Sequence, residues 1–452
     1  MIHALYSVAM WLTQPLLILK LKRRGAQEPG YLHAIPERFG RYTQALPPHD
    51  GPTVWVHTVS LGETRAAAVL ITALRQILPD MRLLLTHGTA TGRAEGAKLL
   101  QPGDLQAWQP WDTVGATQRF LRHFKPQIGV LMETEIWPNL VATCHARQMP
   151  LVLASGRLSD KSLRQAEQLA WLARPAYAGL NAVWPQTPQD AQRFNALGAP
   201  VRAVLGNLKF DATPDAQQIA TGHRWRQQAA RPVLMFASSR EGEELALLQI
   251  LKTFSPPALM NQGSAAIDHE ASKMQWMIVP RHPQRFDEVA ELIQSQGFVV
   301  SRRSSWGTSG PASAQDETGH APTIWLGDSL GEMALYFGLA DVALLGGSFE
   351  PLGGQNLIEA AACGCPVVMG PHTFNFALAS EQAQEAGAAL RVTDLTQGAA
   401  LAAELVTDVE RLANARQACG NFAQAHRGAA QRLARAIVHV MNASVAGLVR
   451  TG

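Results

Sequence analysis

The stretch TVWVHTVSLGETRAAAVLITALRQIL, residues 53–78, determines which fold class we expect. Its first six residues are rich in Val, Trp and Thr, which is typical of a buried β-strand. Ser60, Gly62 and Glu63 follow, and apolar residues then recur at the spacing of an amphipathic helix. A strand followed by a short polar turn and a helix is half of a βαβ unit, which indicates a parallel sheet.

The same order of apolar run, polar or glycine-rich end, and helix recurs along the chain. The further runs that we interpret as strands are 81–88, 128–135, 150–156, 182–187, 201–206, 232–239, 275–280, 297–303, 323–328, 341–347 and 365–370. Between the fifth and sixth of these runs, Pro214 and its polar neighbours indicate a linker. We therefore predict two doubly wound α/β domains, residues 25–215 and 216–452, each a parallel sheet with helices on both faces.

The composition is that of a large globular chain, with 452 residues of which 47% are hydrophobic and 17% charged. The formal net charge of +3 is too weak, and too little concentrated, for a nucleic-acid-binding protein. The four cysteines form no CxxC pair. We therefore expect them to be reduced, as in a cytosolic protein body.

The N-terminus combines an apolar run, residues 4–19, with the basic residues Lys20, Lys22, Arg23 and Arg24. A signal peptide is disfavoured, because its basic residues would come first. A buried core helix remains an alternative, but we favour a membrane anchor over residues 1–24. The run is shorter than the ~20 residues of a spanning helix and contains a proline, so it either spans or lies in the interface. The basic cluster predicts a cytoplasmic position for the body.

Ligands of doubly wound folds bind beyond the carboxyl ends of the strands, so the polar residues that follow each strand are candidates for binding and catalysis. Glu63 either caps a helix or serves as a general base. Glu133 and Glu135 are either solvated acids or a close pair in which one pKa is raised, since residues two apart on an extended segment point the same way. Lys209 is either a surface residue or a partner for an anion.

The second half carries signals for an anionic ligand. Arg281 lies between two prolines, a setting that suits either an anion or a structural salt bridge. Two glycine pairs, Gly346–Gly347 and Gly353–Gly354, allow the backbone to approach a ligand, and the helix start that follows suits a phosphate. Glu359 is placed to accept hydrogen bonds from a ribose. The loop is not GxGxxG, which argues against a plain NAD(P) site.

Taken together, the motifs resemble one family, the Kdo (3-deoxy-D-manno-octulosonic acid) transferases of lipopolysaccharide synthesis, in order from about residue 5 to about residue 425. They are VWVHTVSLGE, ETEIWPNL, LASGRLSDKS, GNLKFD, ASSREGEE, VPRHPQRF, GDSLGEMALYFGLADVALLGGS and GGQNLIEAAACGCPVVMGPHTFNF. The resemblance implies a GT-B glycosyltransferase with two Rossmann-like domains facing a central cleft. It also implies CMP-Kdo as donor, the 6′-hydroxyl of a lipid A precursor (lipid IVA) as acceptor, and the cytoplasmic face of the inner membrane as location.

The resemblance also implies roles for residues. The glutamate of the family's S-x-G-E motif falls on Glu63, the expected base in the acceptor-binding first domain. Expected donor-binding residues are Lys209, Arg240, Arg281, Gly346, Gly347, Gly353, Gly354, Gln355, Asn356 and Glu359, and Ser60, Glu133 and Glu135 are expected to position the acceptor or sugar. The family usually has His where this chain has Arg240 and Gln355, and neither substitute titrates near neutral pH. No cofactor is expected, and no metal, since CMP carries a single phosphate.

Two alternatives to this function remain open. One is a different GT-B enzyme that acts on a UDP-sugar, which the glycine-rich loop alone would allow. The other is a non-catalytic, membrane-associated scaffold, against which Glu63 and Arg281 argue. Binding of CMP rather than UDP would distinguish a Kdo transferase from the UDP-sugar enzyme. Transfer activity would distinguish it from the non-catalytic scaffold.

Overall fold

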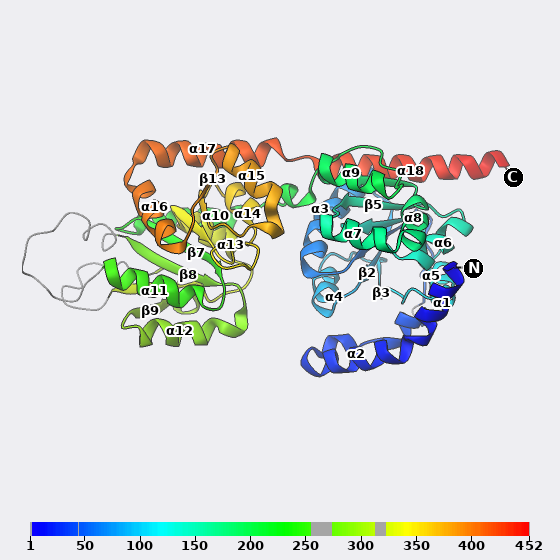
Figure 1. The fold of residues 1–452 in the computed structure, drawn as a ribbon, viewed down its shortest axis with the longest axis horizontal. Coiled ribbons are helices and arrows are strands. Elements are labelled where there is room, and N and C mark those ends of the chain that lie inside the picture. Colours follow the sequence, from blue (N-terminus) through cyan, green and yellow to red (C-terminus); the bar gives the residue numbers. More distant parts are fainter. Residues whose placement is uncertain (1, 44, 255–273, 312–321, 452) are drawn as a thin grey trace, which may run out of the picture. The chain divides into compact units, whose positions relative to one another are not determined.

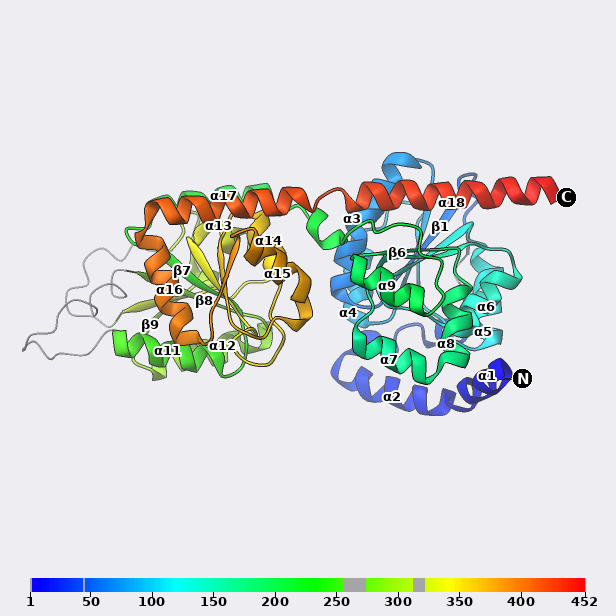
Figure 2. The ribbon, with the colours of Figure 1, turned by 45° about the horizontal axis from the view of Figure 1, so that its top comes forward.

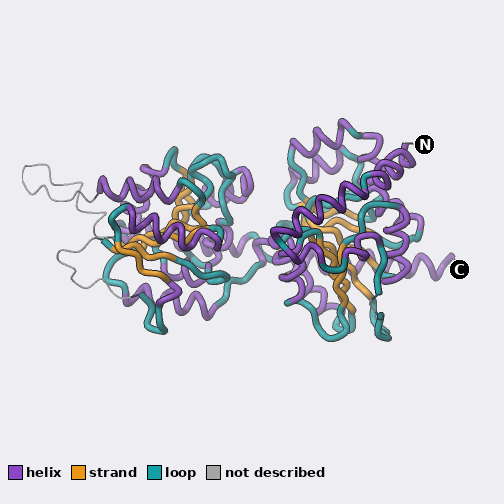
Figure 3. Tube along the Cα trace, turned by 90° about the horizontal axis from the view of Figure 1, so that it is seen from below, coloured by secondary structure: helices purple, strands orange, loops and turns teal. Residues whose placement is uncertain are grey.

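The computed structural model describes residues 2–43, 45–254, 274–311 and 322–451 (Figure 1). The chain forms two compact units, one of residues 1–212 with 426–452 and one of residues 213–425. In each unit, helices lie on both sides of a layer of strands (Figure 3). This arrangement confirms the predicted pair of parallel-sheet α/β domains.

The first unit is built on a six-stranded parallel sheet with the order β3-β2-β1-β4-β5-β6. Its strands are β1 Thr53–Thr58, β2 Arg82–His87, β3 Leu105–Trp108, β4 Ile128–Met132, β5 Leu151–Gly156 and β6 Ala182–Pro185. The predicted strand at 201–206 is reduced to a single bridge between Val201 and Val183. Beyond this bridge the chain passes through Gly206, whose φ is +94°, and leaves the sheet edge.

The helices of the first unit cover both faces of its sheet. They are α3 Leu61–Ile77, α4 Ala90–Ala97, α5 Val114–Phe124, α6 Pro138–Ala146, α7 Asp160–Gln168, α8 Ala170–Ala178, α9 Pro188–Ala196 and α18 Ala429–Thr451, with 3-10 turns η1 Pro29–Leu32, η2 Ile35–Phe39 and η3 Leu208–Asp211. Along β1, Val54 and Val56 join one core and Trp55 joins the other. This alternation is expected for a strand that is buried on both faces.

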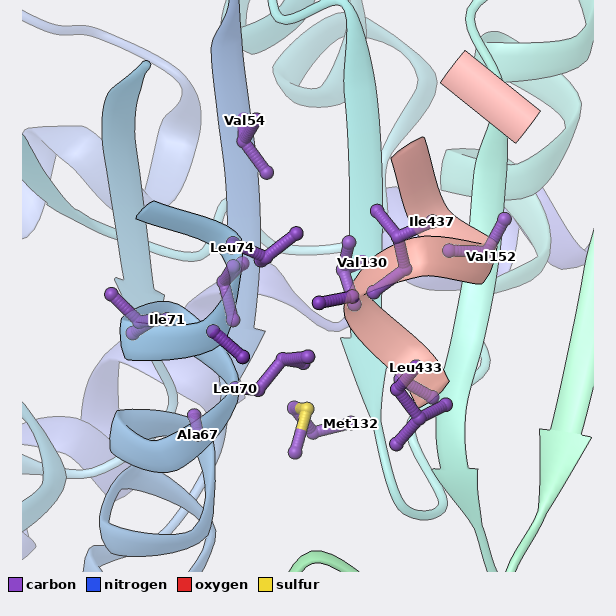
Figure 4. Packing of buried hydrophobic residues seen from close by; sticks show 14 of the residues in the cluster. Val54, Ala67, Leu70, Ile71, Leu74, Val130, Met132, Val152, Leu433 and Ile437 are labelled. Carbon is purple, nitrogen blue, oxygen red and sulfur yellow. The ribbon is translucent and has the colours of Figure 1, made fainter. Parts of the chain in front are cut away.

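The last helix, α18, belongs to the first unit, although the sequence analysis assigned residues 426–452 to the second domain. Its Leu433 and Ile437 are fully buried and lie near Val130 and Val152 of the first sheet (Figure 4). Burial of each such side chain contributes about 1.5–3 kcal/mol. Asp211 also accepts hydrogen bonds from the N–H groups of Gly428 and Ala430 at the start of the helix.

The second unit is built on a seven-stranded parallel sheet with the order β13-β12-β11-β7-β8-β10-β9. Its strands are β7 Val233–Ser239, β8 Gln275–Pro280, β9 Val299–Arg302, β10 Thr323–Leu326, β11 Val342–Leu345, β12 Val367–Met369 and β13 Ala389–Arg391. Its helices are α10 Ala216–Gln228, α11 Glu243–Phe254, α12 Phe286–Ser295, α13 Met333–Leu339, α14 Leu357–Ala362, α15 Ala377–Glu385, α16 Leu395–Thr407 and α17 Val409–Ala425, with 3-10 turns at η5 Pro283–Arg285, η6 Arg303–Ser305 and η7 Phe374–Phe376.

The N-terminal segment forms two helices, α1 Ile2–Leu12 and α2 Gln14–Gln27, that meet at Thr13 (Figure 2). The hydroxyl of Tyr6 donates to Asp112 at 2.8 Å and the hydroxyl of Ser7 to Asn139 at 2.7 Å, so α1 is bonded to the body of the first unit. Within the described part of the chain, every helix is too short or too polar to cross a bilayer. The expected anchor is therefore not confirmed as a spanning helix.

All four cysteines, Cys144, Cys363, Cys365 and Cys419, are buried and free. Their lack of disulfide partners agrees with the reduced state that the sequence predicts.

Candidate active site

In the first sheet the chain order reverses between β1 and β4, which lie side by side with His57 opposite Leu131. Side chains that follow these two strands therefore meet at one edge of the sheet, where doubly wound folds bind their ligands. Ser60 and Glu63 follow β1, and Glu133 and Glu135 follow β4. The four predicted residues thus come together as the order of strands requires.

Glu63 lies in the first turn of α3, where Ser60 is the N-cap residue. Its Oε2 accepts the Val59 N–H at 2.7 Å and its Oε1 accepts the Ser60 hydroxyl at 3.3 Å. The side chain therefore does cap the start of the helix. Burial raises its pKa to about 7, and the nearby negative charges of Glu133 and Glu135 act in the same direction. A carboxylate with such a pKa is suited to general-base catalysis near neutral pH.

Glu133 is held in an unusual conformation at the end of β4. Its φ is +54°, in the left-handed region that non-glycine residues rarely adopt. Its Oε1 lies 3.0 Å from Nζ of Lys209, which belongs to η3 of the same unit. Lys209, which we expected to bind the donor, is thus placed with the acid cluster of the first unit and neutralises part of its charge.

Glu135 is half-buried, and burial raises its pKa. A close pair of acids on an extended segment would also raise one pKa, which is the cause that the spacing of Glu133 and Glu135 predicts. The strand ends at Met132, however, and Glu133 begins a turn. The raised pKa of Glu135 therefore comes from desolvation.

In the second sheet the order of strands reverses between β7 and β11, where Leu345 lies opposite Ala237. The turn after β7 carries Arg240, and the turn after β11 carries Gly346 and Gly347. The two turns are closely packed, since a Cβ on Gly346 would lie 2.2 Å from the Ser238 carbonyl oxygen. Three of the predicted donor-binding residues, Arg240, Gly346 and Gly347, thus lie at the second switch point.

The glycine pairs shape this edge more than they present free N–H groups to it. Gly347, Gly353 and Gly354 have φ values of +69°, +90° and +71°, which only glycine adopts without strain. The N–H of Gly347 donates to Glu243, and that of Gly354 donates to the Gly347 carbonyl at 2.8 Å. The helix that follows, α14, has only six residues, so its dipole is weak. Charge for an anion must therefore come from side chains.

Arg281 and Gln355 form part of that polar edge. The backbone N–H of Arg281 donates to Ser239 at 3.0 Å, and its Nε donates to Oε1 of Gln355 at 3.1 Å. Gln355 thus orients the guanidinium of Arg281. Asn356 is the N-cap of α14, and Glu359 lies in the first turn of that helix.

Arg240 supplies a second guanidinium at this edge. Its side chain lies beside Gly347, and its buried Nε has no hydrogen-bond partner among the described residues. A buried donor without a partner is rare in proteins. An anionic ligand beside Gly347 would satisfy it.

Sequence analysis overlooked one residue at this edge, Glu243 of the ASSREGEE motif. It is 2% exposed, although a glutamate at a helix start is usually solvated. The signal in the sequence was a group of three acids, Glu241, Glu243 and Glu244, within five residues of the end of a strand.

Residues 33–212 match the family model of the 3-deoxy-D-manno-octulosonic-acid transferases. The 3-deoxy-D-manno-octulosonic acid transferase of Bordetella pertussis is 42% identical over 95% of this chain and 97% of its own length. That of Haemophilus influenzae is 28% identical over 95% of this chain and 96% of its own length.

Among solved structures, a glycosyltransferase from Rickettsia africae covers 88% of this chain and 99% of its own, with a TM-score of 0.54 and 9% identity. A UDP-GlcNAc 2-epimerase from Neisseria meningitidis covers 86% of this chain and 99% of its own, with a TM-score of 0.53 and 13% identity. At these identities the two structures are informative about the fold alone.

Proposed function

Because the chain belongs to the 3-deoxy-D-manno-octulosonic acid (Kdo) transferase family, we propose that this glycosyltransferase moves Kdo from CMP-Kdo to the 6′-hydroxyl of a lipid A precursor such as lipid IVA. The observation that carries the proposal is Glu63, a half-buried carboxylate at the switch point of the first sheet whose pKa is about 7.

The reaction that fits these groups is a direct displacement. Glu63 takes the proton of the acceptor hydroxyl while the hydroxyl oxygen attacks the anomeric carbon of Kdo. The bond between that carbon and the phosphate oxygen of CMP breaks at the same time. A single displacement inverts the configuration at that carbon. The first unit therefore supplies the base and holds the acceptor.

The second unit binds the donor in this proposal. Arg281 and Arg240 stabilise the negative charge that develops on the departing phosphate, because guanidinium groups form strong, directed hydrogen bonds to anions. Glu359 accepts hydrogen bonds from the ribose, and the Gly353–Gly354 turn lets the ligand approach the backbone. Gln355 replaces the usual family histidine and acts by orienting Arg281.

We propose a different task for Lys209 from the donor binding that the sequence suggested. Its ammonium group already pairs with Glu133, so we propose that the pair positions the acceptor hydroxyl beside Glu63. The carboxylate of Glu133 lies close enough to Glu63 to favour a raised pKa for Glu63.

The membrane surface enters the proposal through α1 and α2. Both helices expose large apolar side chains: Leu5, Val8, Trp11, Leu12, Leu16 and Leu19. The basic residues Lys20, Lys22, Arg23 and Arg24 follow and are also exposed. We propose that this N-terminal apolar face lies in the cytoplasmic interface of the inner membrane, with the basic residues near anionic headgroups. Apolar Leu169 and Trp171 are exposed nearby, at the start of α8, which contacts α1.

The proposal is tested with the purified full-length chain, CMP-Kdo and detergent-solubilised lipid IVA. Mass spectrometry of the lipid should show the addition of Kdo, and the same mixture with UDP-sugars should show no transfer. Binding of UDP in preference to CMP would favour the alternative of a UDP-sugar enzyme. Binding of CMP without any transfer would contradict the assigned acceptor.

A further inference from the structure

Two adjacent carboxylates are buried at the start of α11, Glu243 and Glu244, which are 2% and 0% exposed. Glu244 forms an ordinary buried ion pair, with Nη1 of Arg285 at 2.7 Å and the hydroxyl of Ser239 at 2.9 Å. Glu243 takes part in none of the salt bridges found among the described residues. Such a burial is costly unless other donors replace water.

The donors that replace water for Glu243 are backbone N–H groups from two separate turns. Its Oε2 accepts the Arg240 N–H at 2.9 Å, and both of its oxygens accept the Gly347 N–H, at 2.9 and 2.8 Å. The Arg240 N–H precedes α11 and the Gly347 N–H lies in a separate turn. The side chain therefore does more than cap this helix. One carboxylate instead joins the turn after β7 to the turn after β11.

These two turns are the ones that surround the switch point of the second sheet. The Arg240 side chain lies against Gly347, and the Gly347 carbonyl accepts the Gly354 N–H. Arg281 also bonds to this edge of the sheet: its N–H donates to the Ser239 carbonyl and its Nε donates to Gln355. Glu243 therefore contacts the backbone of both turns.

We propose that Glu243 is a positioning residue of the donor site, which sets the separation of the Arg240 turn and the Gly346–Gly347 turn so that Arg240 reaches the anionic group of the donor nucleotide. The inference rests on the proposed function, because it takes this edge of the second sheet to bind CMP. A carboxylate suits the task because it accepts from several N–H groups at once. A glutamine has only one accepting oxygen, and its NH₂ group would face an N–H donor.

The test compares Glu243→Gln with two matched variants. Glu244→Gln removes the neighbouring buried charge, and Glu241→Gln removes an exposed charge, since the side chain of Glu241 is 67% exposed. CMP binding is measured by calorimetry, amide hydrogen exchange is measured at residues 239–242 and 345–349, and donor and acceptor KM are measured separately. A positioning role predicts that Glu243→Gln weakens CMP binding by about 10- to 100-fold.

The same variant should exchange faster in those two turns and raise the donor KM while the acceptor KM stays within about twofold. Glu244→Gln should lower the melting temperature without a comparable loss of CMP affinity, and Glu241→Gln should change neither. Unchanged CMP affinity and exchange in Glu243→Gln would overturn the inference and leave the proposed function intact. Failure of the unaltered protein to bind CMP would overturn both, and equal losses in Glu243→Gln and Glu244→Gln would assign Glu243 a purely structural role.

Discussion

At the scale of single residues, Glu63 has a structural role that is compatible with the catalytic role we propose for it. It caps α3 through the Val59 N–H, and this bond aims the carboxylate at the edge of the sheet. The bond also lowers the pKa, but desolvation outweighs it and the pKa settles at about 7. Spacing left open whether Glu63 caps the helix or acts as a base; the structure shows the cap, and this cap does not prevent the proposed role as base.

We predict that Glu63→Gln lowers kcat by about 10²–10⁴-fold, the usual contribution of a general base. The amide retains the size of the side chain and can still accept the Val59 N–H, so the circular dichroism spectrum and melting temperature should stay close to those of the unaltered protein. Steady-state transfer to lipid IVA measures the effect. Arg65→Gln, an exposed change on the same helix, is the control, and near-normal turnover by Glu63→Gln would remove Glu63 from the catalytic role.

A second prediction concerns the guanidinium of Arg281 and its contribution to CMP binding. Removal of its guanidinium in Arg281→Ala should weaken CMP binding by about tenfold to a hundredfold, the range for a hydrogen bond to a charged group. Affinity for the acceptor should not change, because Arg281 lies in the second unit. Calorimetry with CMP is the measurement, and the exposed Arg224→Ala of α10 is the control. If CMP affinity were equal in both variants, Arg281 would be a structural residue of its loop.

At the scale of elements, most strands were predictable, β3 and β13 excepted, and their partners were not. Apolar runs that end in polar residues located β1, β4, β7 and β11, and the order of strands then brought Glu63 near Glu133. The pattern of α18 has apolar residues at 433, 437 and 441, which indicates one buried face. Such a pattern does not say which sheet the face meets. Likewise, nothing local links Lys209 to Glu133, because 76 residues separate them in the chain.

Strands β1 and β2 also hold two buried histidines, His57 and His87. Nδ1 of His57 lies 2.9 Å from the Thr86 hydroxyl, and Nδ1 of His87 lies 3.0 Å from that of Thr58. Burial lowers the pKa of each histidine to about 3. Both therefore stay neutral in the folded protein at pH values where an unfolded histidine, with a pKa near 6.5, takes up a proton.

This difference predicts the sign of an acid effect. As the pH falls below about 6.5, the unfolded chain binds protons at these sites and the folded chain does not, so each histidine lowers the free energy of unfolding. Between pH 6.5 and 4 the loss approaches about 3 kcal/mol per histidine. His57→Asn should therefore show a shallower pH dependence than the unaltered protein in urea titrations over this range. The exposed His439→Ala is the control, and parallel slopes for all three proteins would contradict the assignment.

At the scale of the whole molecule, we propose that the N-terminal segment brings the enzyme to a lipid acceptor at the membrane surface. The sequence left open whether it spans or lies on the bilayer. Its break at Thr13 and the bonds of Tyr6 and Ser7 to the first unit favour a segment that lies in the interface as part of a folded surface. Deletion of residues 1–24 would also remove the buried Leu21, so substitutions are the sharper test.

We predict that replacing Trp11, Leu12 and Leu16 together by serine abolishes flotation with anionic vesicles and leaves the melting temperature unchanged, because all three side chains are at least 61% exposed. Replacing Lys20, Lys22 and Arg23 by glutamine should remove only the salt-sensitive part of vesicle binding. Each charge near an anionic surface contributes about 1 kcal/mol to binding, and salt weakens this contribution by screening. Val409→Ser, a change at an exposed apolar residue of α17, is the control. Both multiple variants should still turn over detergent-solubilised acceptor. Flotation and vesicle activity that survive the serine changes would mean that another surface holds the enzyme at the membrane, and Leu169 and Trp171 would be the next residues to replace.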